Sequence, residues 1–403
     1  MKQGVLTINA GSSSIKFALF ELNSTDNMLA RHPSLSGQID GIGADAKLVA
    51  KDSDDKRFPD VTLVAGIKHK EAFDQLLRWL ATQREASLKR DNEDDWRISA
   101  VGHRVVHGGS LYSQPIVLTP AVLAELEQFV LLAPLHQPHN LAGINALSAL
   151  LPEIPQIACF DTAFHRTQPP VAQMFAIPKA LSAEGVKRYG FHGLSYEYIA
   201  RVLPEHTTKA DGRVLVAHLG NGASMCAMVG RRSQATSMGF TAIDGLMMGT
   251  RTGALDPGVL LYLLENKGMG VKDLTNLLYK QSGLLGVSGI SQDMRTLLAS
   301  DDPAAADAVE LFCYRAITQI GALAAAIGGL DALVFTGGIG EHAAEIRRRI
   351  AEGCAWLGLE FDGSANAADC IRISTAGSRV DALVIPTDEE WMIAEHTRDL
   401  VAA

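Results

Sequence analysis

The stretch Val5–Phe20, VLTINAGSSSIKFALF, decides how the rest of the chain is interpreted. An apolar run, Val5–Ile8, enters the polar segment Asn9–Ser14, and a second apolar run, Ile15–Phe20, follows at once. Two β-type runs around a short Gly/Ser connection predict a β-hairpin. Its tip gathers hydroxyls and backbone N–H groups, and Lys16 adds a positive charge, so the hairpin is a candidate phosphate-binding loop. An ordinary surface hairpin with a polar tip is the alternative interpretation.

The same plan recurs in the second half of the chain, at Val214–Val229, VLVAHLGNGASMCAMV. An offset of 209 residues aligns Val5 with Val214 and Gly11 with Gly220. A repeat at about half the chain length predicts two related domains, each opening on a phosphate-binding hairpin. Two such hairpins facing each other would hold one nucleoside triphosphate between two lobes.

Composition restricts the class of protein. The chain has 403 residues, 47% of them hydrophobic, which is enough for two or more domains with their own cores. A net charge of −9 argues against nucleic acid as a partner. Met1–Ile8 is too short an apolar run for a signal peptide, and the most apolar later stretch, Ile317–Phe335, is interrupted by polar residues and glycines. The five cysteines are scattered and lack CxxC spacing, as expected of core residues in a reducing compartment. We therefore expect a soluble cytoplasmic protein that binds neither nucleic acid nor membrane.

Charged side chains interrupt several apolar or glycine-rich stretches. Arg104 lies in the β-type run of Ile98–Gly109, where its burial is costly unless it faces an anion or an acid. A structural salt bridge is the alternative for Arg104. Asp161 directly follows the short buried strand expected at Gln156–Phe160, the usual place for a catalytic or metal-binding carboxylate in α/β sheets.

Local patterns predict further elements. Helices are expected over Glu71–Thr82, over Ala121–Leu132 after the cap Thr119-Pro120, from Pro303 to just before Gly328, and over His342–Leu357. Ala133–His139 contains two prolines and is expected to be non-helical. The strand Ala332–Thr336, the glycine turn Gly337–Glu341 and the helix that follows predict an anion or nucleotide site.

Nine motifs occur in one order along the chain: INAGSSSIKF, GHRVVHGG, APLH, FDTAFH, RYGFHG, HLGNGAS, MGTRTG, FTGGIGE and PTDEE. From Val5 to Thr397 the chain resembles the acetokinase family, within the superfamily of sugar kinases, actin and heat-shock chaperones. The resemblance implies an α/β chain with a two-lobed, actin-like (ribonuclease H-like) fold. The duplicated domains would each have a mixed five-stranded sheet flanked by helices. Residues 1–163 plus 388–403 would form the N-terminal lobe, with the first phosphate hairpin and the acyl site. Residues 164–387 would form the C-terminal lobe, with the adenosine site and the interface of a homodimer.

The implied reaction is reversible, Mg²⁺-dependent phosphoryl transfer between ATP and acetate, giving acetyl phosphate and ADP, with Mn²⁺ as an alternative metal. A kinase for propionate or another short-chain acyl group is the alternative within the family. A nucleotide-switched structural or chaperone protein on the same fold is the alternative from another class.

The resemblance also assigns roles to individual residues. The catalytic residues would be Arg104, Asp161, His192 and Arg251, and the acyl substrate would contact Arg104, Val106, Leu135, Phe191 and Ala242. ATP would contact Ser12, Ser14, Lys16, His218, Leu219, Gly220, Asn221, Gly222, Asp293, Met294, Arg295, Gly338, Ile339, Gly340, Glu341 and His342. Asn9 and Glu389 would position the metal. Because a carboxylate is already ionised at neutral pH, we expect Asp161 to orient the metal and Arg104 without abstracting a proton.

The chain departs from the family's motifs at several positions. Gln137 replaces the Asn after APLH, Tyr196 stands where a His is common, and Ala254 replaces the Asp expected after MGTRTG. His342 and Asp388 replace Asn in GIGEN and TNEE. Ala242 replaces the proline of SMGFTP, which predicts a deeper or softer acyl pocket and unusually good acceptance of propionate.

Overall fold

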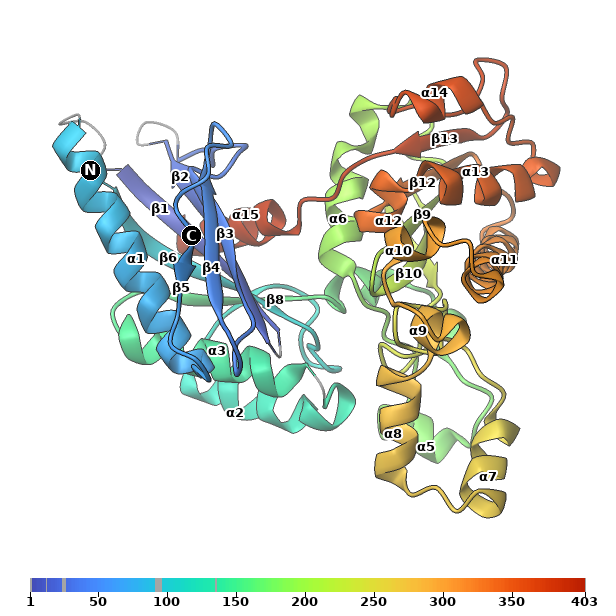
Figure 1. Cartoon of the computed structure of the whole chain (residues 1–403), viewed down its shortest axis with the longest axis horizontal. Helices are drawn as coiled ribbons and strands as arrows, with labels where there is room; N and C mark the ends of the chain where they lie inside the picture. Colours follow the sequence, from blue (N-terminus) through green and yellow to red (C-terminus); the bar gives the residue numbers. More distant parts are fainter. Residues whose placement is uncertain (1, 12, 24–26, 91–95, 135, 403) are drawn as a thin grey trace. The chain divides into compact units, whose positions relative to one another are not determined.

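A computed structural model of the chain describes residues 2–11, 13–23, 27–90, 96–134 and 136–402 (Figure 1). The chain divides into two compact units. Unit 1 consists of residues 1–163 with 388–403, and unit 2 consists of Phe164–Thr387. Each unit has its own β-sheet with flanking helices.

Unit 1 is built on a sheet that, within its described residues, has eight strands in the order β5-β4-β3-β2-β1-β6-β8-β7. They are β1 (Lys2–Ala10), β2 (Ser14–Leu22), β3 (Leu35–Asp40), β4 (Lys47–Asp52), β5 (Val61–Thr62), β6 (Trp96–Val105), β7 (Ile116–Val117) and β8 (Gln156–Phe160). β1 is antiparallel to β2 and parallel to β6, and β6 is parallel to β8. The first hairpin predicted from the sequence is confirmed, and it lies inside the sheet.

Unit 2, whose residues are all described, has a five-stranded sheet in the order β11-β10-β9-β12-β13. The strands are β9 (Arg213–Leu219), β10 (Ala223–Val229), β11 (Arg232–Thr236), β12 (Ala332–Thr336) and β13 (Asp381–Val384). Strand by strand, their directions repeat those of β3-β2-β1-β6-β8 in unit 1. The predicted duplication of a mixed five-stranded sheet is therefore confirmed.

The unit 1 sheet is larger than this shared core. The segment after β2 adds β4 and β5 as an antiparallel meander at one edge, and β7 extends the other. An antiparallel edge accepts such strands through short connections, without a crossover helix. The two hairpins also differ at the turn, because Ala10 pairs with Ile15 whereas Leu219 pairs with Ala223. The offset of 209 therefore holds for the first strand of each hairpin only.

Helices flank both sheets. Unit 1 contains α1 (His69–Arg90), α2 (Pro120–Gln128), the 3-10 turn η1 (Phe129–Leu132), α3 (Gln137–Leu150) and α15 (Glu389–Ala402). From the unit boundary onward the chain forms η2 (Ala163–Thr167), α4 (Pro170–Gln173), α5 (Lys179–Ala183), α6 (Gly193–Val202), η3 (Leu203–Glu205), α7 (Pro257–Asn266), α8 (Val271–Lys280), α9 (Gly283–Ser288), α10 (Met294–Leu298), α11 (Pro303–Ala326), α12 (Gly337–His342), α13 (Ala344–Gly353), η4 (Ala355–Leu357) and α14 (Gly363–Ala367).

The two faces of the unit 1 sheet have different partners (Figure 1). On one face, Phe73 of α1 and Leu147 of α3 share a buried cluster with Ile8 of β1. On the other face α15 packs so closely that a Cβ at Gly102 of β6 would lie 2.6 Å from Cγ2 of Ile393. This second face is called here the α15 face.

Two local predictions were wrong. Ala133–His139 was expected to be non-helical, but α3 begins at Gln137, because Pro138 falls in its first turn, where no backbone N–H is needed. Gly337–Glu341 was expected to be a turn before a helix from His342, but these residues form α12 directly after β12. Gly337 has a φ of 75°, which makes the sharp entry into the helix.

The predicted cap of α2 and the predicted bounds of α11 are confirmed. Thr119 caps α2 by accepting a hydrogen bond from the backbone N of Val122 at 3.3 Å. α11 begins at Pro303 and ends before Gly328. Four cysteines are buried, whereas Cys370 is exposed. In the part of the chain that the structure describes, no helix has the length and apolar character needed to cross a membrane.

Candidate active site

Four predicted polar residues of unit 1 meet on the α15 face. Arg104 lies near the end of β6, Asn9 near the end of β1, Asp161 directly after β8, and Glu389 at the start of α15. The Arg104 guanidinium binds Asp161 in a bidentate manner, with Nε donating to Oδ1 at 2.9 Å and Nη2 to Oδ2 at 2.5 Å. Nη1 donates to Oδ1 of Asn9 at 3.2 Å, and Oε2 of Glu389 lies 3.9 Å from Nε. Because β1, β6 and β8 are parallel, their carboxyl ends bring these distant residues to one edge.

Burial makes this cluster electrostatically strong. The side chain of Asp161 is 1% exposed and that of Arg104 is 19% exposed. Burial acts against the charge on Arg104, but Asp161 and Glu389 outweigh it and raise the pKa of the guanidinium above its ordinary value. Burial raises the pKa of the Glu389 carboxyl, Arg104 opposes that rise, and Asp161 adds to it. Two carboxyl groups thus share one guanidinium, and the cluster favours a further cation.

The donor atoms of the cluster fit a magnesium ion. Asn9 offers an amide oxygen and Glu389 a carboxylate, and oxygen atoms are the ligands that Mg²⁺ takes in proteins. Within the described ranges, no three or more His, Cys, Asp or Glu side chains gather into a cage of their own. Two oxygen donors, Asn9 and Glu389, suit Mg²⁺, which keeps several water molecules and takes one or two protein ligands together with phosphates.

The segment after Arg104 is braced from within unit 1. Val106, predicted to contact the acyl group, is buried, and its backbone N donates to Oδ1 of Asn140 at 3.0 Å. The backbone N of His107 donates to Oε1 of Gln137 at 3.1 Å, and Nε2 of Gln137 donates back to the His107 carbonyl at 3.1 Å. Gln137 is therefore a buried support for this segment. The predicted acyl contact Leu135 and the predicted phosphate contact Ser12 lie outside the described residues.

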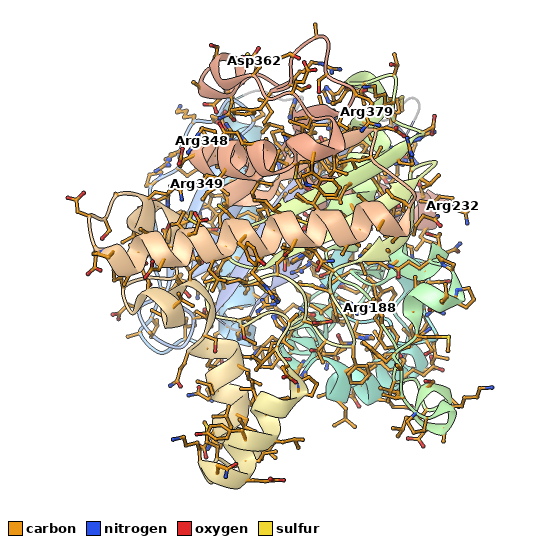
Figure 2. All side chains as sticks on the ribbon, turned by 90° about the vertical axis from the view of Figure 1, so that its right-hand side faces the viewer. Arg188, Arg232, Arg348, Arg349, Asp362 and Arg379 are labelled. Carbon is orange, nitrogen blue, oxygen red and sulfur yellow. The ribbon has the colours of Figure 1, made fainter. Side chains whose placement is uncertain are left out.

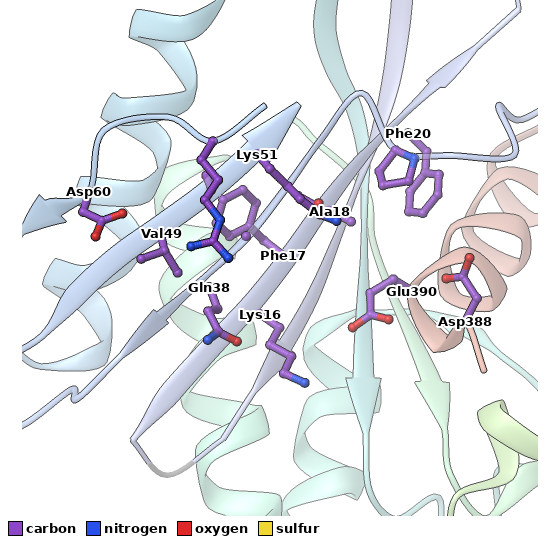
Figure 3. A pocket seen from close by; sticks show the side chains of 15 residues that line it. Lys16, Phe17, Ala18, Phe20, Gln38, Val49, Lys51, Asp60, Asp388 and Glu390 are labelled. Carbon is purple, nitrogen blue, oxygen red and sulfur yellow. The ribbon is translucent and has the colours of Figure 1, made fainter. Parts of the chain in front are cut away.

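Lys16 follows the tip of the first hairpin. The tip is closed by a hydrogen bond from Gly11 N to the Ser14 carbonyl at 2.8 Å. Lys16 pairs with Asn9 across the β1–β2 ladder, so both side chains lie on the α15 face. Lys16 and Glu390 also border a cavity of about 490 Å³ over β2, β3 and β4 (Figure 3). The first hairpin thus places a cation beside the Asn9 end of the cluster.

In unit 2, His192 and Arg251 converge on the turn of the second hairpin. A Cβ at Gly222 would lie 3.4 Å from Nε2 of His192 and 3.5 Å from Nη2 of Arg251. The ring of His192 stacks on that of His218, with centroids 4.4 Å apart and planes inclined by 22°. Nη1 of Arg251 donates to the carbonyl of Ala242 at 2.7 Å. The absence of a side chain at Gly222 leaves open the space that both nitrogen-bearing groups border.

The two acyl residues predicted in unit 2 lie beside this pair. Phe191 precedes His192 in the chain and is buried. Its carbonyl accepts a hydrogen bond from Nε2 of His165 at 2.9 Å. Ala242 is half-buried and orients Arg251 through its carbonyl. A change at Ala242 would therefore reach Arg251 as well as any acyl group.

A cavity of about 520 Å³ in unit 2 gathers eight of the residues predicted to contact ATP. Its lining includes the predicted residues Gly220, Asn221, Asp293, Met294, Arg295, Gly338, Ile339 and His342, and the unpredicted Gln292, Leu298 and Ala343. Asp293 caps α10 and pairs with Arg295, whose Nη2 donates to Oδ2 at 2.6 Å. The volume suits a nucleoside.

The remaining predicted ATP residues of unit 2 do not line this cavity. Leu219 and Gly340 are buried. Glu341 is turned into unit 2, where Oε1 accepts hydrogen bonds from the backbone N of Gly337 at 2.8 Å and of Thr387 at 3.2 Å. Its side chain therefore supports α12 and the end of unit 2.

The sequence interpretation missed a buried arginine behind α12. Arg347 is fully buried, and its Nη1 donates to the carbonyls of Gly340 at 3.2 Å and Glu341 at 2.6 Å. Its neighbours Arg348 and Arg349, labelled in Figure 2, instead pair with Glu345 on the outer side of α13. The sequence did offer an indication of this burial, because Arg347 directly follows Ile346, the one apolar residue in the run Glu345–Arg349.

Comparisons with known proteins agree over nearly the whole chain. The family model described as the Acetokinase family matches residues 4–395. An acetate kinase of Rhodopseudomonas palustris (strain ATCC BAA-98 / CGA009) is 56% identical over 400 residues, which cover 98% of each chain. A solved propionate kinase from Francisella tularensis subsp. tularensis SCHU S4 has a TM-score of 0.89 at 37% identity, covering 98% of this chain and 99% of its own. The acetate kinase of Porphyromonas gingivalis has a TM-score of 0.83 at 36% identity, covering 99% and 100%.

Proposed function

The chain belongs to the acetokinase family, and from that premise we propose how its residues transfer a phosphoryl group between ATP and acetate. The activity is that of an acetate kinase, a phosphotransferase with a carboxyl group as acceptor. The observation that carries the proposed mechanism is the binding of Arg104 by Asp161 and Asn9 on the α15 face.

The acceptor needs no general base. An acetate oxygen attacks the γ-phosphorus, the bond from phosphorus to the β–γ bridging oxygen breaks, and ADP leaves with the electron pair. Acetate is already ionised at neutral pH, so no proton has to be removed. Both oxygens of Asp161 are occupied by Arg104. Asp161 therefore acts as a positioning residue that fixes the orientation of the Arg104 guanidinium.

The catalytic task is to align two anions and to offset charge on the moving phosphoryl group. Arg104 binds the acetate carboxylate or the transferring phosphoryl group. His192 and Arg251 donate hydrogen bonds to the oxygens of the transferring phosphoryl group. Such preorganised donors are often worth several kcal/mol each. In each unit the turn of the hairpin offers backbone N–H groups to phosphate oxygens, and in unit 1 Lys16 adds a positive charge. The cavity that contains Asn221 holds the adenosine.

Asn9 and Glu389 would hold Mg²⁺, with Mn²⁺ as the alternative. When bound, the ion neutralises charge on the phosphates. Glu389→Ala is expected to raise the Mg²⁺ concentration needed for half-maximal activity. If the Mg²⁺ titration curves of variant and parent overlay, Glu389 is only an acid favoured at a helix N-terminus.

The proposal includes a homodimer formed through unit 2. The helix α7 is rich in leucine yet buries none of its residues, and Leu261 and Tyr262 are 56% and 49% exposed. Such an apolar helix surface is typical of a protein interface. Sedimentation velocity should find a dimer that Leu261→Glu weakens. The proposal also places the protein in the cytoplasm, where its substrate ATP is available.

Trapping with hydroxylamine tests the activity directly. ATP, acetate and Mg²⁺ should give acetyl hydroxamate in proportion to the ADP formed. A nucleotide-switched structural protein would instead give slow ATP hydrolysis that does not depend on acetate, and that result would reject the kinase mechanism.

A further inference from the structure

His192 adopts a backbone conformation that needs support. It is the N-cap of α6 with φ 58° and ψ 28°, in the left-handed region that residues with a side chain rarely occupy. Such a conformation persists where surrounding contacts hold it, and it is frequent at functional sites. The contacts around the His192 ring therefore decide where its Nε2 points.

The first of these contacts comes from Ser224 on β10. Its Oγ lies 2.8 Å from Nδ1 of His192, and Ser224 is fully buried. Ser224 stands opposite His218 in the β9–β10 ladder, and His218 stacks on the His192 ring. The second hairpin thus holds the His192 ring in two ways: His218 stacks on the ring face, and Ser224 forms a hydrogen bond with Nδ1.

The second contact comes from Tyr196, one helical turn beyond His192. Its backbone N donates to the His192 carbonyl at 3.1 Å, and its hydroxyl forms a short hydrogen bond with Oγ of Ser224. Side chains on a helix lean toward its N-terminus, so a residue at this spacing reaches back over the cap. Tyr196 is fully buried, and its ring also meets the ring of His165 edge-on at 5.5 Å.

We propose that Tyr196 and Ser224 form a hydroxyl relay that holds His192 as the neutral imidazole with its proton on Nε2. The phenol donates to Oγ of Ser224, and Ser224 donates its single proton to Nδ1 of His192. Nε2 then carries the proton on the side that faces Gly222 and Arg251. The opposite tautomer would turn a lone pair toward the phosphoryl oxygens, which need donors. Tyr196 and Ser224 are positioning residues, and their role rests on the proposed function of His192.

The structure supplies a matched control in the same cluster. Ser195, also on α6, has its Oγ 2.8 Å from Nδ1 of His218. Ser195→Ala and Ser224→Ala each remove one buried hydroxyl from one of two stacked histidines. The hydroxyl lost in Ser224→Ala is the one that is hydrogen-bonded to His192.

Kinetics give the first measurement. Tyr196→Phe, which removes a single oxygen, should lower kcat about tenfold, and Ser224→Ala about 100-fold, as losses of outer hydrogen-bond partners typically do. The KM values for ATP and acetate should stay within about twofold of those of the parent, because neither residue is proposed to touch a substrate. If Ser224→Ala fails to fold, Tyr196→Phe still decides the question.

The ¹⁵N spectrum of histidine-labelled protein gives a measurement that does not depend on activity. In the parent, His192 should show a protonated Nε2 and an unprotonated Nδ1. Tyr196→Phe and Ser224→Ala should shift His192 toward a mixture of tautomers, whereas Ser195→Ala should leave its signals unchanged. A protonated Nδ1 in the parent would overturn the relay.

His192→Ala separates this inference from the mechanism on which it rests. Parental kcat in His192→Ala would overturn the proposed role of His192. An inactive His192→Ala, together with parental kcat and unshifted His192 signals in Tyr196→Phe and Ser224→Ala, would overturn the relay alone.

Discussion

Asp161→Asn tests whether the carboxylate of Asp161 positions Arg104 or removes a proton. The substitution keeps the shape of the side chain but replaces one acceptor oxygen with an NH₂ group that faces the guanidinium. Breaking a buried ion pair costs about 3–5 kcal/mol. Because Asn9 and Glu389 remain near the guanidinium, we expect the lower end, about 3 kcal/mol, for unit 1. Loss of a preorganised Arg104 should lower kcat roughly 10²–10³-fold.

Asp331→Asn is the matched control. Asp331 makes the same bidentate pair with Arg213, through Nε at 3.0 Å and Nη2 at 2.6 Å. The two side chains are 28% and 40% exposed, so the control should lose far less stability and keep full turnover. Urea unfolding of Asp161→Asn is followed by tryptophan fluorescence, because unit 1 contains Trp79, Trp96 and Trp391. Unfolding of Asp331→Asn, which lies in unit 2, is followed by far-ultraviolet circular dichroism.

Two results would refute the positioning role. Parental kcat in Asp161→Asn would mean that Arg104 needs no buried partner. Loss of an acidic limb from the pH profile of kcat/KM, with the stability of unit 1 unchanged, would identify Asp161 as a general base.

Four further predictions follow from the same contacts. Burial lowers the pKa of His103 to about 4, below the unfolded value near 6.5. The unfolded chain therefore takes up the proton first, and unit 1 should lose up to about 3 kcal/mol as the pH falls from 6.5 to 4. An equal loss of stability in the parent and in His103→Gln over this pH range would show that His103 is not the group responsible. Arg251→Ala should lower kcat at least 100-fold with unchanged circular dichroism, and near-normal turnover would remove Arg251 from the mechanism. Ala242→Pro should lower the propionate-to-acetate ratio of kcat/KM about tenfold, and an unchanged ratio would show that Ala242 does not set the acyl pocket. Glu341→Ala should speed hydrogen exchange at the Thr387 amide, whose acceptor it removes, and unchanged exchange would show that the amide has another protector.

The duplicated fold was predictable because its signal is local. Two apolar runs around a Gly-rich turn define a hairpin wherever they occur, and the repeat of Val5–Phe20 at Val214 needs no knowledge of tertiary structure. The edge strands gave a weaker signal, because β5 has only two residues and Val49 interrupts the polar–apolar alternation of β4. The start of α3 was hidden by Pro138, which breaks a helix in its interior but is tolerated in its first turn.

The candidate site was predictable only in part. Arg104 and Asp161 were visible because charged residues interrupt or end apolar strands, and the structure joins them. Asn9 and Glu389 could be named only through the family resemblance, since an Asn in a turn and an acid at a helix start have ordinary structural explanations. Ser224, a partner of His192, escaped prediction because it lies 32 residues away in the sequence, on a different element.

The residues that depart from the family's motifs show why such partners are hard to predict. Gln137 replaces an amide with a longer amide, and its side chain makes hydrogen bonds to both backbone groups of His107. Tyr196 replaces a common His with another hydrogen-bonding group, and its hydroxyl reaches Ser224. In both cases the side chain still forms hydrogen bonds, but its length differs from that of the family's residue. The neighbouring segments must therefore pack differently to accommodate it. Tyr196→His in this chain should therefore not restore a family-like site by itself, because the imidazole is shorter than the phenol and its contact with Ser224 would have to be rebuilt.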